Sequence, residues 1–142
     1  MVKREVVEKR LADLAVRVAR LRTFQAMSAE ELRKDWVKLG VVERLLQTAI
    51  QNVIDIGAHV LADLGDNAWD EYRDIPERLA AHGVLPAELV PSLRAMIGLR
   101  NILVHQYLDV DVEKISAVLR KNLDDFDRFA VAMVNYLKKA QT

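Results

Sequence analysis

The sequence predicts an all-α protein: an up-and-down helical bundle of about four to five helices, formed as a single domain over residues 1–142. Only five glycines and three prolines interrupt the 142 residues. Long segments repeat apolar residues at spacings of three and four, which is the period of a helix that buries one face. A chain of this length buries about 70% of the surface that its unfolded form exposes, so a substantial core is expected. No internal repeat, linker or low-complexity segment divides the chain.

The N-terminal half contains two predicted helical regions. The first covers residues 3–24 and carries one apolar face. Ser28 and Glu31 have the spacing of a capping box, S-x-x-E, and would open the second region. That region runs to about Leu64, with a joint near Gly40, and ends where Gly65 allows the backbone to turn. Its apolar stripe consists of Val42, Leu45, Leu46, Ala49, Ile50, Val53, Ile56, Val60 and Leu61.

The third quarter of the chain predicts a short helix followed by a longer one. The short helix covers about Ile75–His82 and stops at Gly83. The longer helix begins near Pro86, because proline suits the first turn of a helix, and continues to about Tyr107. Pro91 either kinks this helix or marks its true start.

One last helix is predicted for the C-terminal part of the chain. Asp109 or Asp111 can cap its first turn. Its core face recurs at helical spacing and consists of Ile115, Val118, Leu119, Leu123, Phe126, Phe129, Met133 and Leu137.

Composition excludes several classes of function. The chain carries 21 basic and 21 acidic residues, so a polyanion would have to bind a local patch, since no overall positive field attracts it. Cysteine is absent, which removes disulfides, thiolate metal sites and thiol catalysis. The charged start MVKREVVEKR differs from a secretory signal, and charges interrupt every apolar run before 18 residues. A cytoplasmic protein without a membrane span is therefore expected.

The helix that approaches Tyr107 places polar groups among apolar ones. Its two apolar stripes predict a central position, yet Arg100 falls within one of them, where an unpaired guanidinium would cost several kcal/mol in desolvation. Asn101 and His105 stand one turn apart beside Gly98, which leaves room for another backbone or a ligand. This third side of the helix is interpreted as the wall of a cleft.

Arg100 needs an anion, and a purely structural interpretation supplies one from within the protein. Asp55 or Glu43 of the long preceding helix would then make Arg100 half of a buried ion pair. His105 likewise has an ordinary explanation as a residue at a helix end, where the dipole favours its positive form. His82, directly before Gly83, fits that explanation better.

A metal site is not expected. His59 lies in a ladder with Glu43, Gln47, Gln51 and Asp55, each four residues from the next, which is typical of a solvated helix edge. His59 and Asp55 could ligate one ion, but no further residue at ligand spacing completes a set. Glycine-rich phosphate loops and the G-x-S-x-G and H-E-x-x-H motifs are missing as well.

The stretch RNILVHQY, residues 100–107, has the pattern R-x4-H-x-Y. This pattern resembles the HEPN superfamily of all-α proteins and, within it, the HepT toxins of bacterial toxin–antitoxin pairs. The similarity extends to VERLLQTAIQNVIDIGAHVL, residues 42–61, and to the lead-in LPAELVPSLRAMIGLRN, residues 85–101. The resemblance therefore covers most of the chain in matching order and implies a HEPN-like bundle.

The resemblance implies a metal-independent RNA endonuclease, the toxin of a type II or type VII-like toxin–antitoxin pair, which acts as a homodimer without a cofactor. Arg100 and His105 would be its catalytic residues. An imidazole can exchange a proton near neutral pH, and a guanidinium can hold a phosphate and neutralise charge that develops on it. Asn101 would support them by orienting His105 or by donating to a phosphate oxygen.

Five helical steps place Arg100 and His105 about 140° apart, so one straight helix aims both at one atom only through the reach of the arginine or with a second chain. The resemblance further implies that a partner nucleotidyltransferase antitoxin, MntA-like, attaches AMP to Tyr107. Without the motif, Tyr107 is an ordinary core tyrosine with a solvated hydroxyl. The alternative function is a HEPN subunit that docks a nucleotidyltransferase or a nucleotide and cleaves nothing.

Overall fold

The computed structural model describes residues 3–105 and 111–140. Within these residues it contains seven α-helices, two short 3-10 helices and no strand, which confirms the predicted all-α fold. The elements are α1 (Arg4–Arg22), α2 (Ala29–Lys34), α3 (Trp36–Asp63), η1 (Tyr72–Asp74), α4 (Ile75–Ala81), η2 (Ala87–Leu89), α5 (Val90–His105), α6 (Val112–Lys121) and α7 (Leu123–Ala140).

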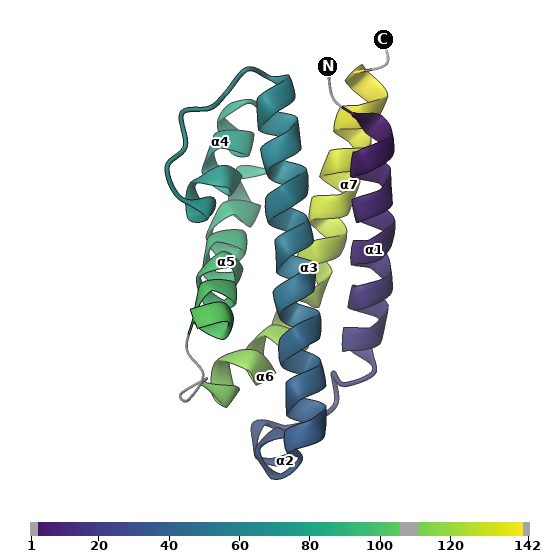
Figure 1. Cartoon of the computed structure of the whole chain (residues 1–142), viewed down its shortest axis with the longest axis vertical. Helices are drawn as coiled ribbons and strands as arrows, with labels where there is room; N and C mark the ends of the chain where they lie inside the picture. Colours follow the sequence, from purple (N-terminus) through teal and green to yellow (C-terminus); the bar gives the residue numbers. More distant parts are fainter. Residues whose placement is uncertain (1–2, 106–110, 141–142) are drawn as a thin grey trace.

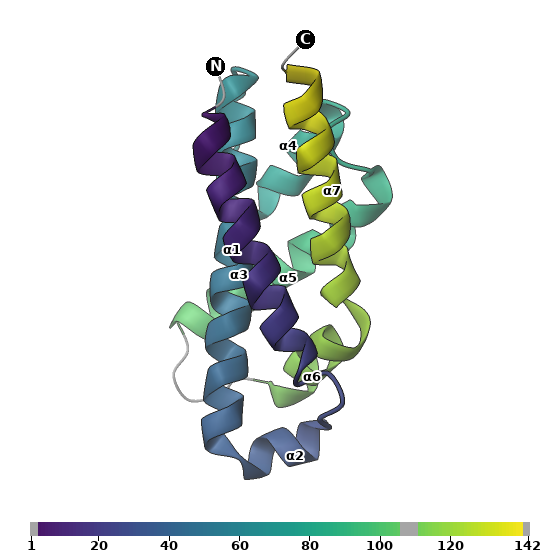
Figure 2. The ribbon, with the colours of Figure 1, turned by 90° about the vertical axis from the view of Figure 1, so that its right-hand side faces the viewer.

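Helix α3 is the longest helix and lies at the centre of the bundle. It packs against α1 on one flank and against α4 and α5 on the other (Figure 1). Helix α7 packs beside α1, and the first and last helices reach the same end of the molecule, while α2 and α6 lie at the opposite end (Figure 2). The bundle therefore has two faces along α3, one lined by α1 and one by α5.

The second predicted helical region is divided, and the joint lies at Asp35 rather than near Gly40. The predicted capping box is present, because the Ser28 hydroxyl accepts from the Glu31 N–H at 3.1 Å and the Glu31 carboxylate accepts from the Ser28 N–H at 3.2 Å. Asp35 ends α2 and caps α3, since its carboxylate accepts from the Lys38 N–H at 3.1 Å. An aspartate that caps a helix is a stronger indication of a helix boundary than a glycine inside a helix.

The C-terminal half follows the predicted order, with two differences. Pro91 marks the start of its helix and does not kink it, because it lies in the first turn of α5, where a missing N–H leaves no hydrogen bond unmade. The predicted last helix is two helices, α6 and α7, which meet at Asn122. Asp124 and Asp125 lie in the first turn of α7, where acidic side chains stabilise a helix N-terminus.

Two candidate caps, Asp109 and Asp111, were predicted for the last helix. Asp111 caps α6, because its carboxylate accepts from the Glu113 N–H at 3.0 Å. Asp109 lies outside the described residues. The predicted apolar face of α6 and α7 is buried, with Val118 as its one partly buried member. No helix in the described part of the chain is long and apolar enough to cross a membrane.

Three glycines determine how the chain turns toward α5. Gly65 and Gly83 have φ values of +74° and +73°, as expected for residues that end helices. Gly57 lies where α4 crosses α3, and a Cβ atom there would stand 2.5 Å from Ile75 Cγ2. This close approach holds α4 against α3 and so fixes the segment before it, residues 66–74, beside α5.

Candidate functional site

Three of the four predicted site residues line one open hollow of about 530 Å3. Arg100, Asn101 and His105 form its α5 wall. The facing wall comes from the segment that leads into α4 and consists of Asp70, Glu71, Tyr72 and Arg73. The fourth predicted residue, Tyr107, lies outside the described residues. The structure thus brings Arg100 and His105 to the same hollow within one chain, despite their separation around the helix.

The facing wall is anchored by a buried carboxylate. Asp66 accepts from the Ala68 N–H at 3.0 Å, from Arg78 Nη2 at 2.7 Å and contacts His82 Nε2 at 2.8 Å. The Ala68 N–H and then the His82 and Arg78 side chains lower the pKa of Asp66 to about 2. His82 therefore has a structural partner, in agreement with its interpretation as a helix-end residue.

A second carboxylate closes the η1 turn that carries Tyr72. Asp74 accepts from the N–H groups of Glu71 at 3.0 Å and Asp70 at 3.2 Å, and these two backbone donors lower the pKa of Asp74. Arg94 of α5 donates to the Arg73 carbonyl at 2.9 Å, which ties the turn to the helix. The wall that faces α5 is thus held by hydrogen bonds to its backbone.

Arg100 is half-buried and is held by neutral groups. Its Nη2 donates to Gln51 Oε1 of α3 at 2.6 Å, and its Nη1 donates to Asn101 Oδ1 at 3.0 Å. The guanidinium carbon lies 5.5 Å from the centre of the Tyr72 ring, within range of a cation–π interaction. Its Nε is buried and has no hydrogen-bond partner. Arg100 therefore keeps its positive charge without a carboxylate among the described residues.

The ion pair of Arg100 with Asp55 or Glu43, which the purely structural interpretation required, is absent from the described part of the chain. Asp55 pairs with Arg10 of α1, Nη1 to Oδ2 at 2.9 Å, because it points to the other flank of α3. Glu43 lies two turns before Gln51 on the same ladder of α3, and burial raises the pKa of its carboxyl group. The anion that Arg100 needs is not supplied by either residue.

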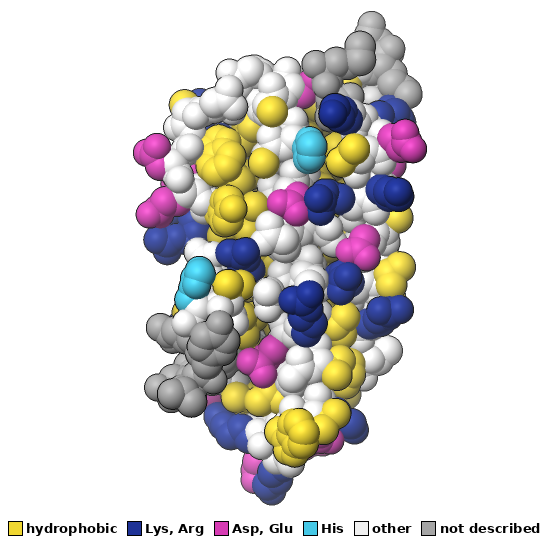
Figure 3. Space-filling model, in the orientation of Figure 1, with side chains coloured by type: hydrophobic (Ala, Val, Ile, Leu, Met, Phe, Trp, Pro, Cys, Tyr) yellow, Lys and Arg dark blue, Asp and Glu magenta, His cyan; other side chains and the backbone are white. Residues whose placement is uncertain are grey.

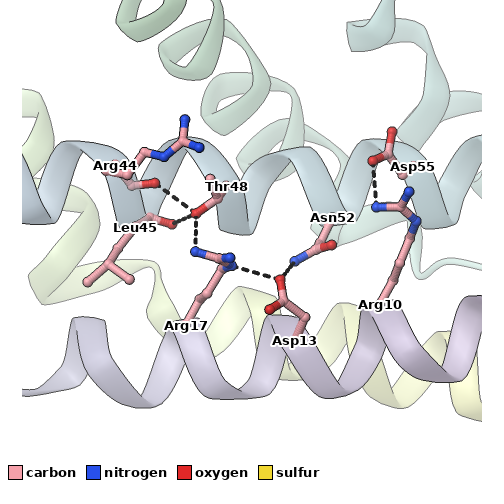
Figure 4. Close-up of polar contacts among 8 residues, drawn as sticks. All are labelled: Arg10, Asp13, Arg17, Arg44, Leu45, Thr48, Asn52 and Asp55. Carbon is pink, nitrogen blue, oxygen red and sulfur yellow. Dashed lines mark hydrogen bonds and ion pairs between the residues drawn. The ribbon is translucent and has the colours of Figure 1, made fainter.

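The α1 flank of α3 shows the opposite pattern (Figure 4). Arg17 Nε donates to Asp13 Oδ2 at 2.7 Å and its Nη1 donates to Thr48 Oγ1 at 2.8 Å. The buried Asn52 donates to the same Asp13 oxygen at 2.7 Å. Each arginine that contacts α3 from this flank, Arg10 and Arg17, thus has a carboxylate partner.

His105 is the last residue of α5, and its side chain is exposed without a polar partner among the described residues. Among the described residues no hydrogen bond joins Asn101 to His105, and the Asn101 side-chain oxygen accepts from Arg100. His59 is partly buried on α3, and its ladder partner Asp55 is occupied by Arg10 and Gln51. Over residues 3–105 and 111–140, no three His, Asp or Glu side chains gather closely enough to hold a metal ion.

Sequence reasoning missed the residues that hold Arg100. Gln51 was noticed only as part of the ladder on α3, and nothing in its spacing distinguishes it from Gln47. Tyr72 lies in an irregular segment, so no periodicity points to it. One signal could have pointed to both residues. An arginine in an apolar stripe of a central helix requires polar or aromatic neighbours on the segments packed against it.

The neutral net charge requires a local patch if the chain binds a polyanion. On the face formed by α1 and α3, Lys and Arg side chains gather across the middle of the molecule (Figure 3). Arg44 of α3 is exposed, and its side chain has no partner among the described residues. Arg10 and Arg17 on the α1 flank are paired with Asp55 and Asp13, so of these three arginines Arg44 is the one without a carboxylate partner among the described residues.

Known proteins are similar to this chain in sequence and in fold. A family model described as Ribonuclease HepT-like matches residues 14–133. The tRNA nuclease HepT of Aphanizomenon flos-aquae is 27% identical over 133 residues, which are 93% of this chain and 90% of that protein. A putative RNase of Archaeoglobus fulgidus is 32% identical over 112 residues, which are 79% of this chain and 83% of that protein.

Solved structures show the same helical arrangement. The tri-AMPylated HEPN toxin of Shewanella oneidensis, solved in complex with an MNT antitoxin, matches with a TM-score of 0.82 at 23% identity, over 92% of this chain and 97% of that one. A toxin–antitoxin structure with AMP-PNP matches with a TM-score of 0.84 at 22% identity, over 92% of this chain and 98% of that one. These matches extend the shared fold to nearly the whole chain.

Proposed function

Because the chain belongs to the HepT-like ribonuclease family, we propose that it is a metal-independent RNA endonuclease, the toxin of a toxin–antitoxin pair. One observation carries the proposal: Arg100, which has no carboxylate partner among the described residues, lines the same hollow as the exposed His105. A phosphate of RNA is the anion that this arginine lacks. We infer that residues 1–142 act as one HEPN-like domain, since a single apolar cluster connects the long helices.

The chemistry follows from these two side chains. The ribose 2′-hydroxyl attacks the adjacent phosphorus, His105 accepts the hydroxyl proton or protonates the leaving 5′-oxygen, and the phosphodiester bond to that oxygen breaks. Arg100 holds the phosphate through two N–H groups and neutralises the charge that develops on its oxygens. Asn101 supports this role, because its oxygen orients the Arg100 guanidinium and its Nδ2 is left as a donor. The products end in a 2′,3′-cyclic phosphate and a 5′-hydroxyl.

The proposal is tested by incubating the purified chain, free of any partner, with RNA in EDTA. Cleavage should survive EDTA and leave 2′,3′-cyclic phosphate or 3′-phosphate ends, which chemical end analysis distinguishes. His105→Ala should reduce the rate by a factor of about 100 or more, because it removes general acid–base catalysis. Products with 3′-hydroxyl ends would refute the mechanism. A folded chain that binds a nucleotidyltransferase but never cleaves RNA would favour the alternative, a non-catalytic binding subunit.

We also propose that the active form is a homodimer whose two-fold interface lies near α5. His105 is the one described histidine that lines the hollow, so a second histidine, for the other proton transfer, would have to come from a second chain. Mixing Arg100→Ala chains with His105→Ala chains tests whether the site is composite. Recovered activity in the mixture would support it, whereas a monomer at micromolar concentration in light scattering would contradict it.

Regulation is proposed to act on Tyr107, by attachment of AMP from an MntA-like nucleotidyltransferase antitoxin. Tyr107 follows His105 by two residues, so an attached phosphodiester would compete with RNA for Arg100 through the same charge that binds substrate. Co-expression with such a partner should add AMP to the peptide that contains Tyr107, as seen by mass spectrometry. Tyr107→Phe should remain unlabelled and active; a label on another residue would show that the assignment is wrong.

A further inference from the structure

A second hollow, of about 710 Å3, adjoins the first between α5 and α6. Arg73 and Asn101 line both hollows, so the two hollows are neighbours beside α5. This size falls in the range of about 300–1,000 Å3 that is typical of small-ligand sites. The second hollow takes no part in the chemistry derived for Arg100 and His105, and its lining indicates what it can hold.

The lining combines an apolar floor with a cationic rim. The floor is made by aliphatic side chains of α5 and α6, namely Met96, Leu99, Ile102, Ala117 and Val118. The rim carries Arg73, Arg94 and Lys114. An apolar surface next to positive charge suits a nucleotide, whose base is flat and poorly hydrated on its faces while its phosphate is an anion.

The three cations of the rim differ in how far they are neutralised. Lys114 is exposed, and its side chain has no partner in residues 3–105 and 111–140. Arg73 has Glu71 at 3.7 Å as its nearest carboxylate, beyond a direct hydrogen bond. Arg94 lies near Glu77 and Asp74, at 3.6 and 3.9 Å, and also supports the Arg73 carbonyl. Lys114 is therefore the rim residue with the most available charge.

Arg73 occupies the boundary between the two hollows. Its aliphatic chain crosses α5 at Gly98, where an added Cβ would stand 3.9 Å from Arg73 Cδ. At that distance an added Cβ would make only an ordinary contact, so the Arg73 side chain packs over α5 at Gly98, and Arg73 lines both hollows. A chain of phosphates that passes from Arg100 toward Lys114 would meet Arg73 on its way.

We propose that the second hollow binds the nucleotide next to the scissile phosphate of an RNA strand, with its base on the aliphatic floor and its phosphate at Lys114. This inference rests on the proposed ribonuclease function. It names Lys114 and the floor residue Ala117 as positioning residues. Because the floor is aliphatic and carries no aromatic side chain, it holds a base by burial rather than by stacking.

The test compares Lys114→Ala with Lys121→Ala, which removes the same charge from the same helix outside the hollow. Steady-state cleavage of a single-stranded RNA should show KM raised about three- to tenfold for Lys114→Ala, with kcat within about twofold. The salt dependence of log KM should fall in slope by about 1, as expected for one lost phosphate contact. Lys121→Ala should match the unaltered chain in both measurements.

A second variant addresses the base. Ala117→Trp fills the hollow from the α6 side and should raise KM about tenfold or more, with circular dichroism as the check on folding. If this variant does not fold, the lysine pair still decides. Equal KM and salt slope for Lys114→Ala and Lys121→Ala would overturn the subsite while leaving the ribonuclease intact.

Failure of the ribonuclease itself has a different signature. If the unaltered chain does not cleave RNA, the proposed function is wrong, and the same two lysine variants are then compared by fluorescence anisotropy on a labelled RNA oligomer. Equal Kd values would overturn the subsite as well. If Lys114→Ala leaves RNA binding unchanged but abolishes association with a nucleotidyltransferase, the hollow docks a protein and the proposal is wrong.

Discussion

The two flanks of α3 handle positive charge in opposite ways. On the α1 flank, Arg10 and Arg17 each contact a carboxylate, Asp55 and Asp13, at 2.9 and 2.7 Å (Figure 4). On the α5 flank, Arg100 meets amide oxygens and an aromatic ring. Arginine side chains are therefore paired with carboxylates where α3 packs against α1. Where α3 packs against α5, Arg100 has no carboxylate partner among the described residues.

This difference distinguishes residues that join helices from residues that await a ligand. An ion pair between partly exposed groups holds two helices in register and contributes about 0.2–1 kcal/mol. A guanidinium that is oriented by neutral acceptors keeps nearly all its attraction for an incoming anion, and it needs no partner to be displaced first. The α1 flank is thus a structural contact, and the α5 flank has the features expected of the proposed phosphate site.

The largest effect should come from removing the charge on each flank in turn. Arg100→Ala is expected to reduce RNA cleavage by a factor of about 100 or more, because phosphate stabilisation is lost. Arg17→Ala, the matched change on the α1 flank, should leave the rate within about threefold. Cleavage rates of folded proteins, checked by circular dichroism, measure both. If Arg100→Ala unfolds the chain, the α5 flank is a structural contact as well.

The next effect should come from making the α5 flank resemble the α1 flank. Gln51→Glu places a carboxylate 2.6 Å from Arg100 in nearly the same volume. The arginine is then paired within the protein, so cleavage should fall about tenfold or more, although the variant also loses the hydrogen bond from Gln51 Nε2 to Asp55 Oδ1. Gln47→Glu, one turn away on the same ladder, controls for the added negative charge. Equal rates for the two variants would show that neutral contacts to Arg100 are unimportant.

A smaller effect is expected from the aromatic contact. Tyr72→Ala should reduce cleavage about two- to fivefold, because a cation–π interaction at a partly exposed site contributes roughly 0.5–1 kcal/mol to the position of the guanidinium. Tyr72→Phe keeps the ring and should cleave at nearly the unaltered rate. A loss as large for Tyr72→Phe would assign the role to the hydroxyl instead.

The smallest effect on activity should come from the paired flank, where stability changes instead. Arg17 and then Asn52 donate to Asp13 and lower its pKa. A carboxyl group with a depressed pKa stabilises the folded state above its unfolded pKa of about 3.9, and this contribution is lost as pH falls through the lower folded pKa. Asp13→Asn should therefore lower Tm by about 2–4 °C at pH 7, by less below pH 4, and leave cleavage unchanged. Equal Tm values for the two proteins at pH 7 would contradict the assignment.

The sequence predicted the helices better than their joints. Apolar spacing located α1, α4 and α5 to within a few residues, because burial of one face is what makes these segments helical. The breaks at Asp35 and Asn122 were missed, because no glycine or proline marks either position and the apolar spacing continues across them, although Asp35 caps α3 through the nearby Lys38 N–H. The capping box at Ser28 was recognised because both of its partners lie within three residues.

The same distinction applies to the candidate site. The motif identified Arg100, Asn101 and His105, and all three line one hollow, although their catalytic roles stay predictions. The structural alternative for Arg100, an ion pair with Asp55 or Glu43, is absent among the described residues, and spacing could not single out Gln51, because the ladder on α3 offers Glu43, Gln47, Gln51 and Asp55 at equal intervals. Only the rotation of α3 between α1 and α5 decides that Gln51 faces Arg100 while Asp55 faces Arg10.

Gln51 also connects the two flanks of α3. Its Nε2 donates to Asp55 Oδ1 at 2.9 Å while its oxygen accepts from Arg100. A carboxylate that accepts from an amide polarises it and makes the amide oxygen more negative, since hydrogen bonds in a chain reinforce one another. Through the Gln51 amide, Asp55 strengthens the hydrogen bond that Gln51 accepts from Arg100. The Asp55 carboxylate itself stays one side chain away from the guanidinium. Arg100 is thereby held without a full opposing charge, which is what the proposed binding of a phosphate requires.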